Sequence, residues 1–388
     1  MIPFMLKSVL MLLVLYLAFT SPLSAQWLPD PEIDETIQRG IGNIYNLEFE
    51  SADKEFANVV SLRPDHPVGY FFQAMTEWWR ILIDLENESR DEKFFSMLEK
   101  IIEMCEQRLE KNPSDITALF FKGGSIGFRG RLRANRGSWF SAAQDGVAAL
   151  PVVRKAYDLD QNNSDILLGM GIYNYYADII PQEYPLIKPF MWFFPSGDKA
   201  KGLQQLHRAA DNGKYAHIES TYFLMQNYFF YEKEYSKALE MAQKLSGMFP
   251  RNPVFLRYLG RCNVRLGNWS EVNRVFGEID KRYREQQTGF SVSDAREAAY
   301  YLGRFLFIGI DKEGSLKHFN RCEELSRIVD KEEGSGFMTM ANLHIGMIYD
   351  MQKKRSLAIM QYQKVLKMKE YEESHKDARR YLQQAYTR

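Results

Sequence analysis

The stretch PVFLRYLGRCNVRLGNWSEVNRVFGEI, residues 253–279, decides the fold. It is typical of two short amphipathic helices joined by a tight turn at Gly267 and Asn268, because apolar residues recur in it every three or four positions. Gly260 lies in the apolar stripe of the first helix, where the lack of a side chain lets a second helix cross closely. A lone hairpin cannot bury both stripes, so it needs neighbours of its own kind.

Such neighbours follow at a fixed spacing. Phe276 lies 16 residues after Gly260, and the pairs Gly303–Phe319 and Gly346–Tyr362 repeat this spacing. No alternating pattern of a β-strand competes with the helical pattern. We therefore expect regular helical hairpins over residues 219–388, ended by a capping helix with a polar outer face near residues 374–387.

The paired small and aromatic residues resemble the tetratricopeptide-repeat (TPR) pattern. The resemblance implies an all-α solenoid, a right-handed superhelix of helical hairpins. In residues 26–218 the match is partial, and the repeats are enlarged. Gly40, Gly123 and Gly171 take the crossing position there, and two insertions are expected, at residues 129–147 and 178–198.

Residues 1–25 have the pattern of a signal peptide. Lys7 precedes the apolar run 8–20, and small residues then lead to an expected cleavage before Gln26, where a lipoprotein would have cysteine. The expected location is the periplasm or cell envelope, with secretion as an alternative. The 50 basic and 50 acidic residues cancel, which argues against general nucleic-acid binding.

The first candidate site is a row of arginines. Arg257, Arg261 and Arg265 recur every four residues, so they share one helix face. The TPR resemblance implies that the first helices of the hairpins line a concave groove that binds peptides. It places seven residues there: Asn227, Tyr231, Arg257, Arg261, Arg265, Tyr300 and Arg304.

Like charges in a row repel one another, so the row indicates either an anionic partner or intervening carboxylates. Arginine suits an acidic peptide because its planar fork binds carboxylates with two hydrogen bonds. The alternative is a solvated cationic face screened by neighbouring glutamates. On the first interpretation, reversing Arg261 and Arg265 to Glu abolishes binding and leaves the melting temperature nearly unchanged.

Two further segments are candidates. In the first, Arg129, Arg131, Arg133, Arg136 and Trp139 either hold a phosphate or carboxylate beside an aromatic ring, or form a structural extension whose arginines pair with Asp145 and Asp158. In the second, the aromatic run at residues 190–194 is too short to span a bilayer. This run is expected to contact a membrane surface or a partner, or to fold back on the solenoid over Tyr173, Tyr175 and Tyr176.

Signals for catalysis are weak. The six histidines are scattered, and the three cysteines, Cys105, Cys262 and Cys322, fall on helix stripes where they act as small apolar residues. We expect no cofactor and no metal. The sequence favours an exported scaffold or binding protein for a protein or peptide partner. The alternative is a small-ligand-binding or catalytic protein whose pocket is closed by residues 129–147 and 178–198.

Overall fold

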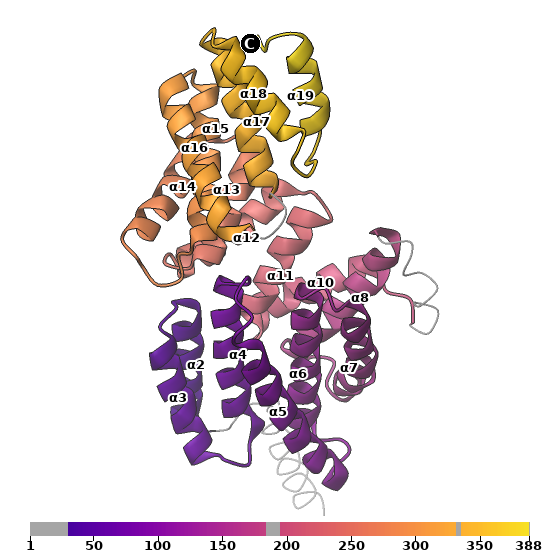
Figure 1. Cartoon of the computed structure of the whole chain (residues 1–388). Coiled ribbons are helices and arrows are strands. Elements are labelled where there is room, and N and C mark those ends of the chain that lie inside the picture. The colour runs from indigo at the N-terminus through magenta and orange to yellow at the C-terminus, as the bar shows by residue number, and fades with distance from the viewer. Residues whose placement is uncertain (1–29, 184–194, 331–334, 388) are drawn as a thin grey trace, which may run out of the picture. The chain divides into compact units, whose positions relative to one another are not determined.

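A computed structural model describes residues 30–183, 195–330 and 335–387. Within these ranges every regular element is a helix, which confirms the all-α solenoid (Figure 1). The chain divides into two compact units. The N-terminal unit comprises Met1–Ile81 and Asn87–Leu224, and the C-terminal unit comprises Leu82–Glu86 and Met225–Arg388. The main division lies close to the change at residue 218 that the sequence predicts.

The N-terminal unit consists of long helical hairpins. Its helices are α2 (Pro31–Tyr45), α3 (Phe49–Leu62), α4 (Pro67–Ile83), α5 (Asp91–Lys111), α6 (Ile116–Asn135), α7 (Trp139–Leu159), α8 (Ile166–Glu183), α10 (Lys199–Asn212) and the first part of α11 (His217–Phe230).

The C-terminal unit consists of shorter hairpins that stack in the order of the sequence (Figure 1, orange to yellow). Its further helices are α12 (Tyr235–Met248), α13 (Pro253–Leu266), α14 (Trp269–Arg284), α15 (Val292–Ile308), α16 (Lys312–Val329), α17 (Gly336–Met351), α18 (Arg355–Val365) and α19 (Ser374–Gln383).

The α13–α14 hairpin has the local structure that its sequence predicts. The Asn252 side chain accepts hydrogen bonds from the first backbone N–H groups of α13, and Pro253 follows at a position where no N–H is needed. Gly267 ends the helix with φ +74°, a left-handed conformation that glycine adopts without steric cost. The turn therefore reverses the chain within two residues.

The crossing glycines lie against the aromatic rings that the spacing predicts. A Cβ atom added to Gly260 would lie 2.7 Å from the ring of Phe276. At Gly303 the corresponding distance to Phe319 is 3.0 Å, and at Gly346 the distance to Tyr362 is 2.5 Å. Gly40 and Phe56 of the N-terminal unit make the same contact at 2.5 Å. The three aromatic rings of the C-terminal pairs are fully buried, so these contacts belong to the core.

We expect Gly260→Val to destabilise the protein by ~1–3 kcal/mol, because the added atoms overpack the crossing with Phe276. Thermal unfolding followed by circular dichroism measures the effect. Gly277→Ala in α14 is the matched control, since a Cβ there meets nothing within 4 Å and alanine favours the helix. Equal melting temperatures for Gly260→Val and the wild type would contradict the register.

Residues 129–147 are arranged differently from expectation. They continue α6 to Asn135 and form the first turns of α7, so they lengthen a hairpin rather than interrupt it. Gly130 stays helical because Asp145 packs over it, 3.0 Å from where its Cβ would lie. The reversal occurs at Gly137, which has φ +74°. Of the second expected insertion, residues 178–183 belong to α8, and residues 184–194 lie outside the described residues.

The three cysteines are buried and unpaired, as predicted. Burial raises the pKa of each thiol to about 12, so all three remain protonated near neutral pH. They act as packing residues.

Candidate functional site

The arginine row on α13 does not act as one group. Arg257 forms an ion pair with Asp294 at 3.1 Å, and Asp294 also caps α15 by accepting a hydrogen bond from the Ser291 backbone. Arg261 forms two parallel hydrogen bonds of 2.6 Å to the Glu297 carboxylate. Both carboxylates come from α15 and are almost fully buried. The first two arginines of the row therefore hold neighbouring hairpins together.

The ion pair with Glu297 fixes the charge of Arg261. Burial opposes that charge, but the adjacent carboxylate outweighs it and raises the pKa of Arg261 above its ordinary value. Removing one member of such a pair leaves the other charged in a site that water reaches poorly. This ion pair argues against the expectation that reversing both Arg261 and Arg265 to Glu leaves the melting temperature nearly unchanged, because Arg261 is part of the folded framework.

Arg265 and Arg304 are different. Among the described residues neither has a carboxylate partner, and each guanidinium lies over an aromatic ring. Arg265 lies 5.6 Å from the ring centroid of Tyr235, and Arg304 lies 5.2 Å from that of Trp269. Stacking on an aromatic ring positions a guanidinium while leaving its N–H donors available.

The two arginines contact equivalent residues of successive repeats, but they come from different positions of their helices. Arg265 lies five residues after its crossing glycine, and Arg304 lies one residue after its own. Each comes from a first helix and lies over the residue that begins the second helix of the preceding hairpin, Tyr235 in α12 or Trp269 in α14. Arg265 lies four residues after Arg261, and Arg304 lies seven residues after the paired Glu297. Because 1.5 Å of rise separates successive helical residues, their heights along the helices differ by only ~5 Å.

Three of the seven predicted groove residues are placed less favourably for binding. Asn227 is fully buried, and Tyr300 is 7% exposed. Tyr300 packs in the core against Phe319 and His344. Asn227 and Tyr300 are thus too buried to line an open groove. Tyr231 is half-buried just beyond the end of α11.

The arginines of residues 129–136 are bound to carboxylates. Arg129 and Arg133 contact Asp145 at 2.6 and 2.8 Å, and Arg136 binds Asp91 through two hydrogen bonds. The structural alternative for this segment is confirmed in its pairing with Asp145, whereas Asp158 is exposed. Trp139 is 66% exposed at the start of α7.

Arg131 belongs to a buried polar centre that the sequence did not reveal. Glu219 of α11 accepts hydrogen bonds from the Tyr45 hydroxyl at 3.2 Å and from the Trp79 indole at 3.0 Å. The Arg131 guanidinium lies 3.5 Å from the same carboxylate and 4.5 Å from the ring centroid of Phe223. Burial and the charge of Glu219 raise the pKa of Tyr45 far above its ordinary value. The residues are 88 to 174 positions apart from Glu219, too far for a local pattern to show.

These contacts show which part of the chain lies against the first helices of the N-terminal unit. Tyr45 ends α2, Trp79 lies in α4, and Arg131 lies in α6, so all three first helices contact the start of α11. Lys214, just before α11, adds an ion pair to Asp34 of α2 at 2.7 Å. These side chains of the first helices are therefore held within the chain itself, and we place the candidate site in the C-terminal unit.

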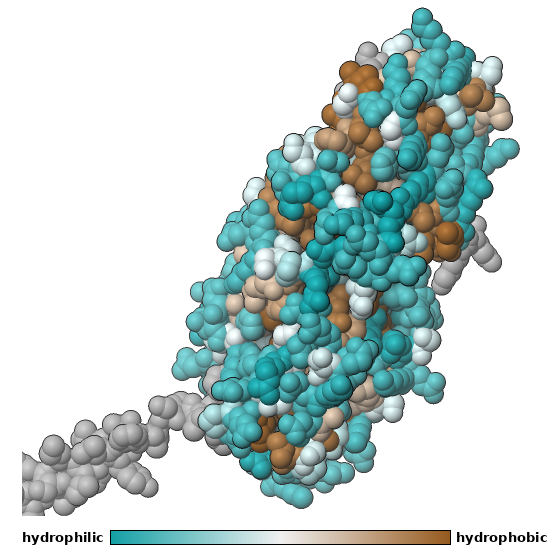
Figure 2. Space-filling model, turned by 90° about the vertical axis from the view of Figure 1, so that its left-hand side faces the viewer, coloured by the Kyte–Doolittle hydropathy of each residue, from teal (hydrophilic) through white to brown (hydrophobic). Residues whose placement is uncertain are grey.

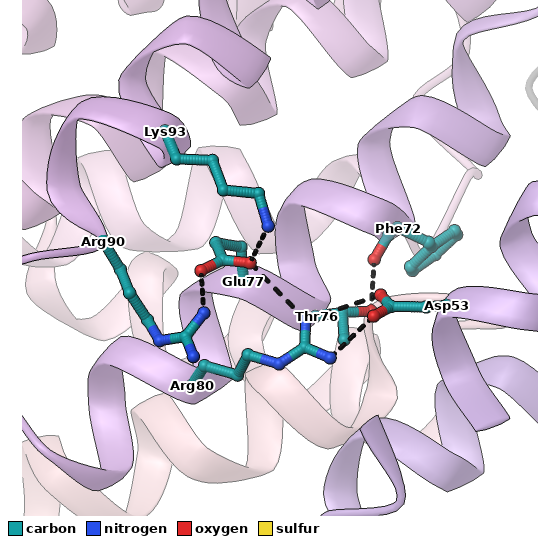
Figure 3. A network of polar contacts seen from close by, with 7 residues as sticks. All are labelled: Asp53, Phe72, Thr76, Glu77, Arg80, Arg90 and Lys93. Atoms are coloured by element: carbon teal, nitrogen blue, oxygen red, sulfur yellow. Dashed lines mark hydrogen bonds and ion pairs between the residues drawn. The ribbon is translucent and has the colours of Figure 1, made fainter. Parts of the chain in front are cut away.

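A second buried carboxylate holds the loop between α4 and α5 (Figure 3). Glu77, only 1% exposed, contacts Arg90 and Lys93 at 2.7 Å each, and Arg80 at 3.4 Å. Arg80 also reaches Asp53 of α3 at 2.6 Å. Burial alone would raise the pKa of Glu77, but the hydrogen bonds from Lys93 and Arg90 outweigh it and hold that pKa below its ordinary value. The network's stabilisation is complete above the unfolded pKa and is lost as pH falls through the lower folded pKa.

The third predicted candidate, residues 190–194, lies outside the described residues. The residues that follow it lie against α8. Tyr173 donates a hydrogen bond to the Pro195 carbonyl at 2.5 Å, and the backbone N–H of Asp198 donates to Asn174 at 3.0 Å. Tyr175 is buried. Tyr173 thus contacts the end of the insertion, as predicted for a segment that folds back.

The described ranges contain no helix long and apolar enough to cross a membrane. The same residues include no group of three or more His, Cys, Asp or Glu side chains arranged to hold a metal ion. On the face shown in Figure 2, hydrophobic residues form separate patches in a largely hydrophilic surface.

Comparison with known proteins agrees with the architecture. No protein-family model matches the chain, and no curated protein matches it. A tetratricopeptide repeat protein from Parabacteroides merdae aligns over 80% of this chain and 99% of its own, with 12% identity and a TM-score of 0.33. The APC/C hetero-tetramer Cut9–Hcn1 aligns over 95% of this chain with 12% identity and a TM-score of 0.50. The chain has a TPR fold.

The TPR chain described here spans 58% of the matched chain of the Cut9–Hcn1 structure. The human IFIT1 dimer with m7Gppp-AAAA aligns over 92% of this chain and 88% of its own, with 14% identity and a TM-score of 0.43. At these identities the similarity shows the TPR fold alone. The function must therefore be argued from the side chains.

Proposed function

We propose that this TPR protein is a binding or scaffold protein that recognises an acidic segment of a protein or peptide partner through its C-terminal unit. The observation that carries the proposal is the contrast within the arginine set. Arg257 and Arg261 are neutralised by buried carboxylates, whereas Arg265 and Arg304 are held over aromatic rings without one. Two pre-positioned guanidinium groups favour a ligand that brings its own carboxylates.

The neighbouring carboxylates support this assignment because they have partners of their own. Glu234 pairs with Lys237 at 2.6 Å, and Glu271 pairs with Arg274 at 2.7 Å. Asp311 accepts a hydrogen bond from the Gly314 backbone as the cap of α16. Each of these carboxylates thus has a cation or a backbone donor of its own, and an incoming carboxylate meets two cations already in place.

A binding measurement with a poly-glutamate peptide of about twelve residues tests the proposal. Fluorescence anisotropy should show binding to the wild type that weakens as ionic strength rises, because the contacts are exposed to solvent. The double variant Arg265→Glu with Arg304→Glu should weaken binding by about tenfold or more, since each charge-assisted contact contributes up to ~1.5–3 kcal/mol before screening.

The matched control is Arg274→Glu, an exposed arginine on α14 that pairs with its neighbour Glu271. It changes the net charge in the same direction and should leave peptide binding nearly unchanged. The double variant should keep its helicity and melting temperature, because neither arginine pairs with a carboxylate in the described part of the chain. Binding that survives the double reversal, or that does not respond to salt, would exclude this site.

We propose further that the protein acts in the periplasm or cell envelope. The support is the sequence of residues 1–25 alone, with its basic start, apolar run and small-residue end. N-terminal sequencing of the protein from its native cell should find Gln26 first, and a retained Met1 would contradict the proposal.

A further inference from the structure

Exposed apolar side chains accompany the two open arginines. They lie where three successive first helices of the C-terminal unit end: Phe230 at the end of α11, Leu266 at the end of α13, and Ile308 and Ile310 at the end of α15. Phe230 is 50% exposed and Ile310 is 57% exposed. We call the surface at the ends of α13 and α15 the turn edge and define it by Arg265, Leu266, Arg304, Ile308 and Ile310.

The contacts between helices place these residues on one edge. Arg257 and Arg261 pair in order with Asp294 and Glu297, so α13 and α15 run parallel and their C-terminal ends lie on the same side. Phe229 and Phe230 at the end of α11 contact Tyr258 of α13. Tyr258 lies eight residues before the end of α13, so these contacts place Phe230 beside the body of α13. The ends of α13 and α15 therefore lie side by side, with one exposed apolar group on α13 and two on α15.

The position of Ile310 adds to the argument. Ile310 has φ +67°, a left-handed conformation that a β-branched residue rarely adopts. Its side chain is nevertheless more than half exposed, in a turn where glycine or asparagine would adopt this conformation at lower cost. An apolar side chain retained in a strained, exposed turn is better explained by an external contact than by the packing of this chain.

We propose that the turn edge docks an amphipathic, acidic α-helix of a partner protein, which lies across the ends of α13 and α15. This deepens the proposed function and rests on it for the acidic character of the partner. The apolar side of the partner helix covers Leu266 and its neighbours. Its carboxylates reach Arg265 and Arg304, which lie within the same row.

The distance between the apolar groups of the turn edge favours a helix as the ligand. Packed helices lie ~8–10 Å apart, so the apolar groups recur at about that interval along the edge. In an α-helix, residues seven positions apart lie on one face and ~10.5 Å apart. In an extended strand a similar distance separates residues three positions apart, and those point to opposite faces. A helix with apolar residues at every seventh position therefore matches the edge.

Two synthetic peptides of about twenty residues test the inference. Both consist of leucine, glutamate and alanine in the same proportions and carry a fluorescent label. One has leucine at every seventh position, and its isomer has leucine at every fifth position, which spreads the apolar groups around the helix. Anisotropy titrations with the full chain should show the seven-residue peptide binding about tenfold or more tightly than the isomer.

Variants separate the apolar contribution from the charges. Leu266→Ser with Ile310→Ser should remove the preference for the seven-residue peptide, whereas Leu357→Ser, an exposed leucine on α18 that is 42% exposed, should keep it. Arg265→Ala with Arg304→Ala should weaken both peptides by a similar factor of about five to ten. Circular dichroism of each variant confirms that the fold is intact.

The outcomes distinguish the two proposals. If both peptides bind equally and depend on Arg265 and Arg304, the acidic site stands and the helix-docking inference is wrong. The helix-docking inference is also wrong if Leu266→Ser with Ile310→Ser changes nothing, or if poly-glutamate binds and neither peptide does. If Arg265→Ala with Arg304→Ala leaves peptide binding unchanged, the proposed acidic site is wrong instead. If none of the three peptides binds, both proposals are wrong.

Discussion

Replacing Arg261 by Glu is expected to destabilise the C-terminal unit by ~3–5 kcal/mol. The substitution removes the partner of Glu297, whose side chain is only 3% exposed, and places a second carboxylate where the guanidinium was. Folded domains are stable by only ~5–15 kcal/mol, so the loss takes a large share of the total. Urea unfolding followed by circular dichroism should show a clearly lower midpoint.

The control for this prediction lies one helical turn further along α13. Arg265→Glu makes the same chemical change at a residue without a carboxylate partner, so its midpoint should stay near that of the wild type. Replacing both members of the pair by apolar residues, Arg261→Met with Glu297→Leu, should recover much of the loss because no buried charge remains unpaired. Equal midpoints for Arg261→Glu and Arg265→Glu would show that the pair does not stabilise the fold.

Glu219→Ala is expected to cost the N-terminal unit a similar ~3–5 kcal/mol. The Tyr45 hydroxyl and the Trp79 indole would lose the hydrogen bonds that now join α2 and α4 to α11. Arg131 would keep its aromatic surroundings but lose the carboxylate beside it. Thermal unfolding and limited proteolysis measure the effect, with earlier cleavage expected near the start of α11.

Two further variants refine the result at Glu219. Glu103→Ala, on the exposed side of α5, controls for the loss of a carboxylate and should be close to neutral. Glu219→Gln keeps the size of the side chain and an acceptor oxygen, so it should cost less than Glu219→Ala. A Glu219→Ala protein as stable as Glu103→Ala would contradict the role of this buried centre.

Much of the fold could be predicted because its determinants are local. The glycine and aromatic residue of each hairpin lie a fixed distance apart in one short stretch, and the structure brings each pair into contact. The Gly40–Phe56 pair has the same spacing of 16 residues, so the N-terminal hairpin carries the signal too. Residues 129–147 were expected to be an insertion because the TPR match is only partial there, but they lengthen α6 and α7, and the chain reverses at Gly137.

The candidate site was harder to predict because it depends on contacts between hairpins. Helix geometry placed Arg257, Arg261 and Arg265 on one face, but a single helix does not show which of them meets a carboxylate. That depends on α15, 36 residues further along the chain for the Arg261–Glu297 pair. The burial of Asn227 and Tyr300 could not be predicted from a single helix for the same reason. The Glu219 centre joins residues up to 174 positions apart, which no local pattern reveals.

The ion pairs between α13 and α15 also limit how the hairpins can be rearranged. Asp294 and Glu297 lie nine and six residues before their crossing glycine, Gly303. In the α13 hairpin the same two positions hold Arg251 and Val254. A tandem duplication of that hairpin would therefore set Arg257 and Arg261 against an arginine and a valine. The α13 hairpin is thus specific for the hairpin that follows it, and a gain or loss of a repeat at this place in the gene would leave these arginines without their acids unless both changed together.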